Sequence, residues 1–338
     1  MLNIYHELPA GLLTREAHQL HEVLPGPSLI HLSGKRTQPL FVSVLMHGNE
    51  VTGWLAVREI LQKYRDLELP RSLSLLIGNV SAAQKGVRCL PDQPDYNRIW
   101  QGIGDGAEQV MVRQVLEEMR NLDPYACVDL HNNTGLNPHY ACINRLDRPF
   151  LQLASLFSRT VVYFLRPEGV LSKAFAEICP AVTIECGRPG LPHGTAHAVE
   201  YIDACLHMAE IPQHDVAPHD IDLFHTMAIV KVPSHIKIGL EGELADICLP
   251  EELDHLNFRE LVPGTVLCHV GNDATDVSLF ATNEQGEDVS ERYFEIHDAT
   301  IRTRIPVMPS MLTLNTDIIR QDCLCYLMER YDLAGVNE

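Results

Sequence analysis

Short apolar runs alternate with amphipathic stretches over the first two thirds of the chain. Compact apolar runs predict buried strands, and apolar residues spaced three and four apart predict helices. The expected strands are 41–46, 73–77, 126–130, 161–165 and 181–184, and the expected helices are 51–64, 110–122, 150–157 and about 195–209. Residues 1–37 mix polar and apolar positions and predict a helix and an edge strand. This alternation indicates an α/β domain whose mixed, mostly parallel sheet carries helices on both faces.

The pattern changes after residues 212–218, a proline-flanked segment typical of a linker. Beyond it, short strand-like runs at 227–232, 265–270 and 277–281 alternate with turn signals such as Pro263-Gly264. We therefore expect two domains, an α/β domain over 1–212 and a smaller β-rich domain over 213–338. The second is expected to cover the active-site cleft of the first.

Three polar side chains follow expected strands directly. They are His47 after the run 41–46, His131 after 126–130 and Glu185 after 181–184, and Glu50 lies three residues beyond His47. In sheets of this class, ligands bind beyond the carboxyl ends of the strands. Two histidines and one glutamate form a common catalytic zinc shell that leaves a position open for water. Gly48 allows the tight bend that brings His47 and Glu50 toward one point.

Taken alone, His47 is as readily a structural residue as a ligand, because the chain has 17 histidines. Four segments read in order change this interpretation: 47–50 (HGNE), 95–98 (DYNR), 129–132 (DLHN) and 184–187 (IECG). With them the chain resembles the succinylglutamate desuccinylase and aspartoacylase family, a branch of the zinc carboxypeptidase clan. Segments 75–79, 261–264 and 312–315 extend the resemblance over nearly the whole length.

The resemblance implies one zinc ion per chain, held by His47, Glu50 and His131. It implies that Glu185 is the general base, which takes a proton from water and hands it to the leaving amine. It further implies that Asn97 and Arg98 grip a substrate carboxylate, and that Arg88 polarises the scissile carbonyl.

Three neighbouring residues receive structural interpretations. Asp129 is expected to point to the opposite face of its strand from His131. It is therefore interpreted as a structural partner and not as a metal ligand. Asn49 and Asn132 are interpreted either as groups that orient the ligands or as loop caps.

The sequence departs from the family where the substrate is selected. Aspartoacylases carry a further arginine about ten residues before the catalytic glutamate, whereas here Phe175 lies near that position and Lys173 is the nearest cation. A lysine does not reproduce the bidentate guanidinium. Tyr293 is an approximate substitute for an aromatic residue that the family supplies from its C-terminal domain. The acyl group and the amino acid of the substrate are therefore not identified by the sequence.

Composition limits the partners. With 45 acidic and 26 basic residues the net charge is −19, which argues against nucleic acid and anionic membranes. The N-terminus lacks a signal-peptide pattern, and the ten cysteines form no paired CxxC motifs, so a cytoplasmic location with reduced thiols is expected. The expected partner is a small N-acyl amino acid or a short peptide, and homo-oligomer formation is left open.

The function predicted from these residues is zinc-dependent hydrolysis of the amide bond of an N-acyl amino acid or a related carboxylate-bearing amide. One alternative is a zinc carboxypeptidase that acts on peptides with the same catalytic residues. An alternative of another class is a metal-binding or regulatory module without turnover. His193 and His197 share a helix face, but three protein ligands already suffice for zinc. Cys186 is a poorer nucleophile candidate, because no histidine is evidently positioned to activate it.

Overall fold

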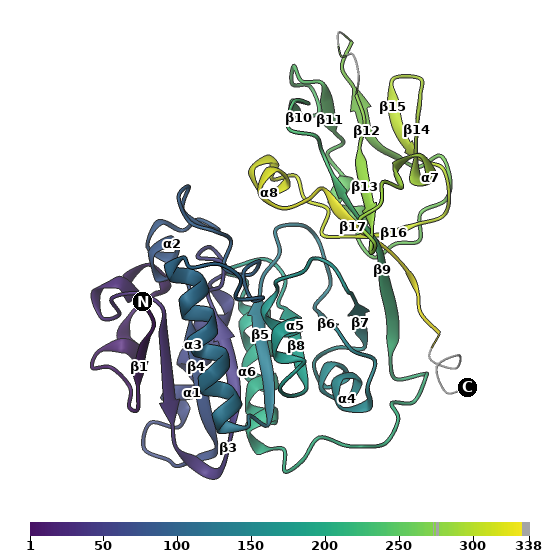
Figure 1. Ribbon diagram of the computed structural model, residues 1–338. Coiled ribbons are helices and arrows are strands. Elements are labelled where there is room, and N and C mark those ends of the chain that lie inside the picture. The colour runs from purple at the N-terminus through teal and green to yellow at the C-terminus, as the bar shows by residue number, and fades with distance from the viewer. Residues whose placement is uncertain (273, 275–276, 333–338) are drawn as a thin grey trace. The chain divides into compact units, whose positions relative to one another are not determined.

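The computed structural model describes residues 1–272, 274 and 277–332, and the chain forms two compact units (Figure 1). The first unit comprises Met1–Asn132, His139–Tyr163 and Pro167–Asp222. The second comprises the remaining described residues, Asn133–Pro138, Phe164–Arg166 and the chain from Leu223. The main chain connection between the units thus lies between Asp222 and Leu223. The sequence predicted this boundary earlier in the chain, at 212/213.

A mixed sheet runs through the first unit in the order β1-β2-β4-β3-β5-β8-β6-β7. Its strands are β1 (Asn3–Tyr5), β2 (Ser28–Leu32), β3 (Gly34–Val44), β4 (Leu69–Ile77), β5 (Ala126–His131), β6 (Tyr140–Ile143), β7 (Thr160–Tyr163) and β8 (Ala181–Glu185). Only the β2–β4 and β6–β8 pairs are antiparallel. The central strands β4, β3, β5 and β8 are parallel neighbours, so their carboxyl ends meet at one edge.

Helices cover both faces of this sheet. They are α1 (Thr52–Lys63), α2 (Val80–Lys85), α3 (Ala107–Leu122), α4 (Arg148–Phe157), α5 (Leu171–Phe175) and α6 (Pro192–His207). The ring of Phe41 on β3 stacks on Phe175 of α5, with the ring centroids 4.2 Å apart. Val44, three residues further along β3, instead packs against Gly53 of α1, which has no side chain to separate them. Successive strand residues point to opposite faces, so α1 and α5 lie on opposite sides of β3.

These observations confirm the predicted α/β fold class, but some elements differ from the prediction. Residues 1–37 contain the 3₁₀ helices η1 (Leu12–Thr14) and η2 (Ala17–Glu22), not an α-helix. The short elements α2, α5 and β6 were not predicted. Each is four to six residues long, which is too short for periodicity to reveal it.

The second unit is rich in strands. β9 (Asp222–Lys231) pairs with β17 (Cys325–Arg330) and β13 (Phe280–Asn283), and β17 pairs with β16 (Met308–Ser310). A separate five-stranded sheet has the order β10-β11-β12-β15-β14. Its strands are β10 (Ile238–Leu240), β11 (Ile247–Leu249), β12 (Val266–Val270), β14 (Phe294–His297) and β15 (Thr300–Thr303). The helical elements are η3 (Leu253–Leu256), α7 (Ser290–Tyr293) and α8 (Thr316–Gln321). Buried apolar residues such as Ile247, Leu267 and Leu327 form its core.

The segment 312–315 is well ordered by contacts inside this second unit. Asn257 holds the backbone of Leu312 from both sides, accepting from its N–H at 2.8 Å and donating to its carbonyl at 2.9 Å. A Cβ at Gly135 would lie 1.8 Å from the same carbonyl, so only glycine fits there. Asn315 caps α8. The segment 312–315, which carries part of the resemblance in the sequence, is therefore tightly packed.

A membrane-spanning helix is not found in the described part of the chain, where every helix is too short or too polar to cross a bilayer.

Candidate functional site

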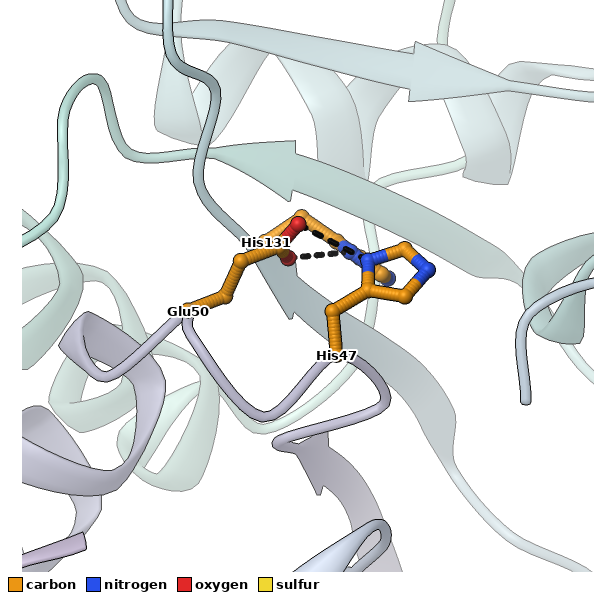
Figure 2. Close-up of side chains that lie close together, drawn as sticks. All are labelled: His47, Glu50 and His131. Carbon is orange, nitrogen blue, oxygen red and sulfur yellow. Dashed lines mark hydrogen bonds and ion pairs between the residues drawn. The ribbon is translucent and has the colours of Figure 1, made fainter. Parts of the chain in front are cut away.

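Three potential metal ligands lie together at the carboxyl edge of the central strands (Figure 2). His47 and Glu50 lie in the turn between β3 and α1, and His131 is the last residue of β5. Gly48 lets this turn approach α2 closely, since a Cβ there would lie 2.2 Å from the backbone of Ala82. The local chain path thus depends on glycine at the position between the two ligands.

The donor atoms of the three residues suit a single cation. Glu50 Oε1 lies 2.8 Å from His47 Nδ1, and Glu50 Oε2 lies 2.7 Å from His131 Nδ1. One ligand atom from each residue lies within 4.8 Å of the other two, and all three side chains are buried. Two imidazole nitrogens and one carboxylate oxygen are a donor set that zinc accepts. The residues present therefore fit the metal that the sequence implied.

Each histidine is held by a carboxylate on the side away from Glu50. His47 Nε2 lies 3.0 Å from Asp95 Oδ1, and His131 Nε2 lies 3.0 Å from Asp129 Oδ2. Ser43 Oγ donates to the other oxygen of Asp129 at 2.5 Å. A carboxylate on the second ring nitrogen fixes the tautomer and the orientation of a metal-binding histidine.

The predicted orientation of Asp129 was wrong. Residues two apart in a strand point to the same face, so Asp129 and His131 lie side by side on β5. Its interpretation as a structural partner is compatible with the contact that it makes to His131 Nε2. Asp95 is the partner that sequence reasoning left without a role. The signal was its place in the quoted segment 95–98, directly before the Asn-Arg pair.

Charges in this buried cluster are closely coupled. Burial acts to raise the pKa of the Glu50 carboxyl, but His47 and His131 outweigh it and hold that pKa well below its usual range. Burial acts to lower the pKa of His131, yet Asp129 and Glu50 raise it well above the ordinary value. The carboxylates therefore favour positive charge at the point where a cation would bind.

Replacement of Asp129 by asparagine is expected to weaken metal binding by about 10- to 100-fold, because a neutral amide accepts from His131 Nε2–H less strongly. Competition with a chromophoric chelator measures this affinity. Asp203→Asn is the matched control, since Asp203 pairs with Lys63 at the surface of α6. Equal affinities in the two variants would contradict a role for Asp129 in holding His131.

Both the side chain and the backbone of Arg88 make contacts that reach the turn carrying His47 and Glu50. Its Nε and Nη2 both donate to Asp95 Oδ2, at 3.0 and 2.8 Å. Its carbonyl accepts from the Gly48 N–H at 3.1 Å. Burial acts to raise the pKa of Asp95, but His47, Arg88 and Arg98 lower it far below its usual range. Asp95 is thus a carboxylate shared by a ligand and an arginine.

Asn97 is buried beside His131, with its amide orientation set by the backbone. Its Oδ1 accepts from the Leu171 N–H at 2.9 Å, so its Nδ2 is the atom that faces His131 Nε2, at 3.2 Å. If His131 Nδ1 binds a metal, Nε2 carries the ring proton and donates to Asp129. Two N–H donors do not bond to each other, so the amide hydrogens of Asn97 would remain available to another acceptor. This is the arrangement that a substrate-binding amide needs.

Asn132 links the turn, the strand and the loop after Glu185. Its backbone N–H donates to Glu50 Oε2 at 3.2 Å, and its Oδ1 accepts from the N–H of Thr52. Its Nδ2 donates to the carbonyl of Gly187 at 2.8 Å. Asn132 therefore contacts both a candidate ligand and the first residue of α1. Asn49 Oδ1 is buried and meets no hydrogen-bond partner among the residues that the structure describes.

Glu185 ends β8 and pairs in register with His131 on β5. It is buried, with 6% of its surface exposed.

Lys173 lies on the short helix α5, two residues after the Leu171 that holds Asn97. The neighbouring Cys186 is buried, and burial and the adjacent Glu185 raise the pKa of its thiol well above the ordinary value. A thiol in that state is a poor nucleophile.

The fold and this cluster define an α/β protein with a candidate metal centre at the carboxyl ends of parallel strands. Residues 37–199 match the succinylglutamate desuccinylase/aspartoacylase catalytic domain. This match confirms the resemblance seen in the sequence over residues 37–199. Members of the family are deacylating hydrolases.

Solved structures agree on the fold. Succinylglutamate desuccinylase from Chromobacterium violaceum superposes with a TM-score of 0.55 at 15% identity, covering 88% of this chain and 87% of that chain. Murine aminoacylase 3 has a TM-score of 0.53 at 16% identity, with 88% and 97% covered. The ectoine utilization protein EutE (DoeB) from Ruegeria pomeroyi has a TM-score of 0.55 at 15% identity, with 90% and 88% covered. No curated protein sequence matches the chain.

Proposed function

We propose that the protein is a zinc-dependent deacylase that hydrolyses the amide bond of an N-acyl amino acid or a related small carboxylate-bearing amide. The observation that carries this proposal is the convergence of His47, Glu50 and His131 in a domain of a deacylating family. A zinc ion held by these residues would supply Lewis acidity and make water nucleophilic at neutral pH.

Glu185 is the proposed general base. It lies at the end of the strand next to His131, on the edge of the sheet where the ligands converge. A carboxylate there takes a proton from the attacking water and delivers it to the leaving nitrogen as the C–N bond breaks. The products are a carboxylic acid and a free amine.

Four further side chains are proposed to hold the substrate. Arg98 and the Nδ2 amide of Asn97 would bind the carboxylate on the amino-acid side, because a guanidinium offers paired N–H donors to a carboxylate. Arg88, oriented by Asp95 through two hydrogen bonds, would stabilise the negative charge that develops on the carbonyl oxygen. Lys173 is proposed as a further substrate contact, in which its ammonium group acts as a single positive charge and not as a bidentate donor.

A panel of N-acyl amino acids, their carboxamide analogues and short peptides tests this function. The wild-type protein is expected to hydrolyse the free acids in preference to the carboxamides. In Arg98→Ala, KM for the free acids should rise about tenfold or more, the cost of a lost charge-assisted hydrogen bond, while carboxamide hydrolysis changes little.

Arg145→Ala is the matched control, since Arg145 is a half-exposed arginine paired with Asp147. Loss of activity toward acids and carboxamides alike would contradict carboxylate recognition by Arg98. Preference for peptides over every acyl-amino acid would instead identify a carboxypeptidase.

A further inference from the structure

Three histidines other than His47 and His131 gather in the first unit. His139 directly precedes β6, and His193 and His197 lie in the first turns of α6. The His139 ring centroid lies 5.3 Å from that of His193 and 5.1 Å from that of His197. His193 and His197 are four residues apart, so they project from the same face of the helix. Helix geometry and the start of β6 together create this cluster.

The spacing of these rings matches that of a metal-binding pair. In the candidate metal centre, the ring centroids of His47 and His131 are 5.1 Å apart. Zinc–nitrogen bonds of about 2.0–2.1 Å in a tetrahedral shell separate two ligand nitrogens by roughly 3.3 Å. His139 Nδ1 and His197 Nδ1 lie 2.9 Å apart, within a few tenths of an ångström of that separation.

The protonation state also suits metal binding. Two Nδ1 atoms in hydrogen-bond contact require one donor and one acceptor, so one Nδ1 of the pair is unprotonated. Burial, together with His197 and His193, lowers the pKa of His139 below its ordinary value. His139 is therefore the neutral imidazole that coordination requires near pH 7.

The surroundings leave room for these rings and hold them. His197 stacks on Phe157, with the centroids 4.2 Å apart and the planes 11° from parallel. A Cβ at Gly187 would lie 3.0 Å from His139 Nε2, so glycine at that position keeps space beside the ring. His193 is exposed and able to turn.

We propose that His139, His193 and His197 form a second metal site for a divalent transition-metal ion of the kind that imidazole favours, with zinc as the ion to test. The rings are now 12° and 19° from parallel, against 62° for His47 and His131. Rotation about the soft terminal torsions of His139 and His193 turns their nitrogens toward His197, whose ring stays stacked on Phe157. An ion bound there would link the residue before β6 to the first turns of α6.

Isothermal titration of the zinc-loaded, dialysed protein with Zn²⁺ tests this site. Wild type is expected to bind one further equivalent per chain. His197→Gln and the double variant His193→Gln/His197→Gln are expected to lose that equivalent. Both should keep the tightly held zinc, as measured by elemental analysis after dialysis.

His207→Gln is the matched control, because it removes a histidine from the other end of the same helix. It is expected to bind the further equivalent as wild type does. Absence of a further equivalent in wild type, or its persistence in the double variant, would overturn the proposal. Circular dichroism of each variant shows whether α6 remains folded, and His139→Gln supplies an independent third test outside that helix. Because the readout is stoichiometry, the result does not depend on deacylase activity.

Discussion

Glu185→Gln is expected to retain tightly bound zinc and to hydrolyse acyl-amino acids about 10²- to 10⁴-fold more slowly than wild type. Glutamine keeps the shape of the side chain but has no carboxylate to accept a proton from water. Steady-state kinetics and elemental analysis of dialysed protein measure the two effects separately.

Glu177→Gln is the matched control, since Glu177 is an exposed carboxylate in the same region of the sequence. An unchanged rate in Glu185→Gln would reject general-base catalysis by this residue. Loss of zinc together with loss of rate would assign Glu185 to metal binding and not to proton transfer.

His47→Ala is expected to abolish both tight zinc binding and hydrolysis. Removal of His47 leaves neither of its carboxylate partners, Asp95 and Glu50, without another hydrogen-bonding group. Asp95 still pairs with Arg88, and Glu50 still contacts His131. The apo protein should therefore stay folded, which separates loss of the ligand from loss of the fold.

Thermal unfolding with and without zinc measures this effect. At a free zinc concentration of 1,000 times Kd, ligand binding stabilises a folded protein by about 4 kcal/mol. Wild type should show a stabilisation of that order, and His47→Ala should not show it at the same zinc concentration. His219→Ala, at an exposed histidine, is the control. A His47→Ala protein that retains zinc and activity would refute the proposed metal centre.

Strong periodicity made the larger elements predictable. The apolar spacing at 51–64 and 110–122 corresponds to α1 and α3, and the apolar runs at 73–77 and 126–130 correspond to parts of β4 and β5. These segments are long enough for the repeat to outweigh local chance. The short helix α5 and strand β6 gave no such signal, and the 3₁₀ helices near the N-terminus follow from tertiary packing and not from a repeat.

The clustering of the candidate site residues was predictable for a different reason. Parallel strands place the residues at their carboxyl ends along one edge of the sheet, so His131 and Glu185 could be grouped from the sequence alone. The roles of Ser43 and Asp95 were not accessible in this way. Each contacts its partner across a long stretch of sequence, Ser43 to Asp129 and Asp95 to His47, and only side-chain packing brings them together.

The sequence by itself determined the α/β class, the edge of the sheet where chemistry is expected, and the residue types that gather there. Strand periodicity and chain order are local properties, so they can be read along the chain. Only the tertiary structure decided which ring nitrogens face Glu50, which carboxylates hold the histidines, and that His139 lies against His193 and His197. Such contacts depend on side-chain directions and on distances between segments far apart in sequence, which no local pattern encodes.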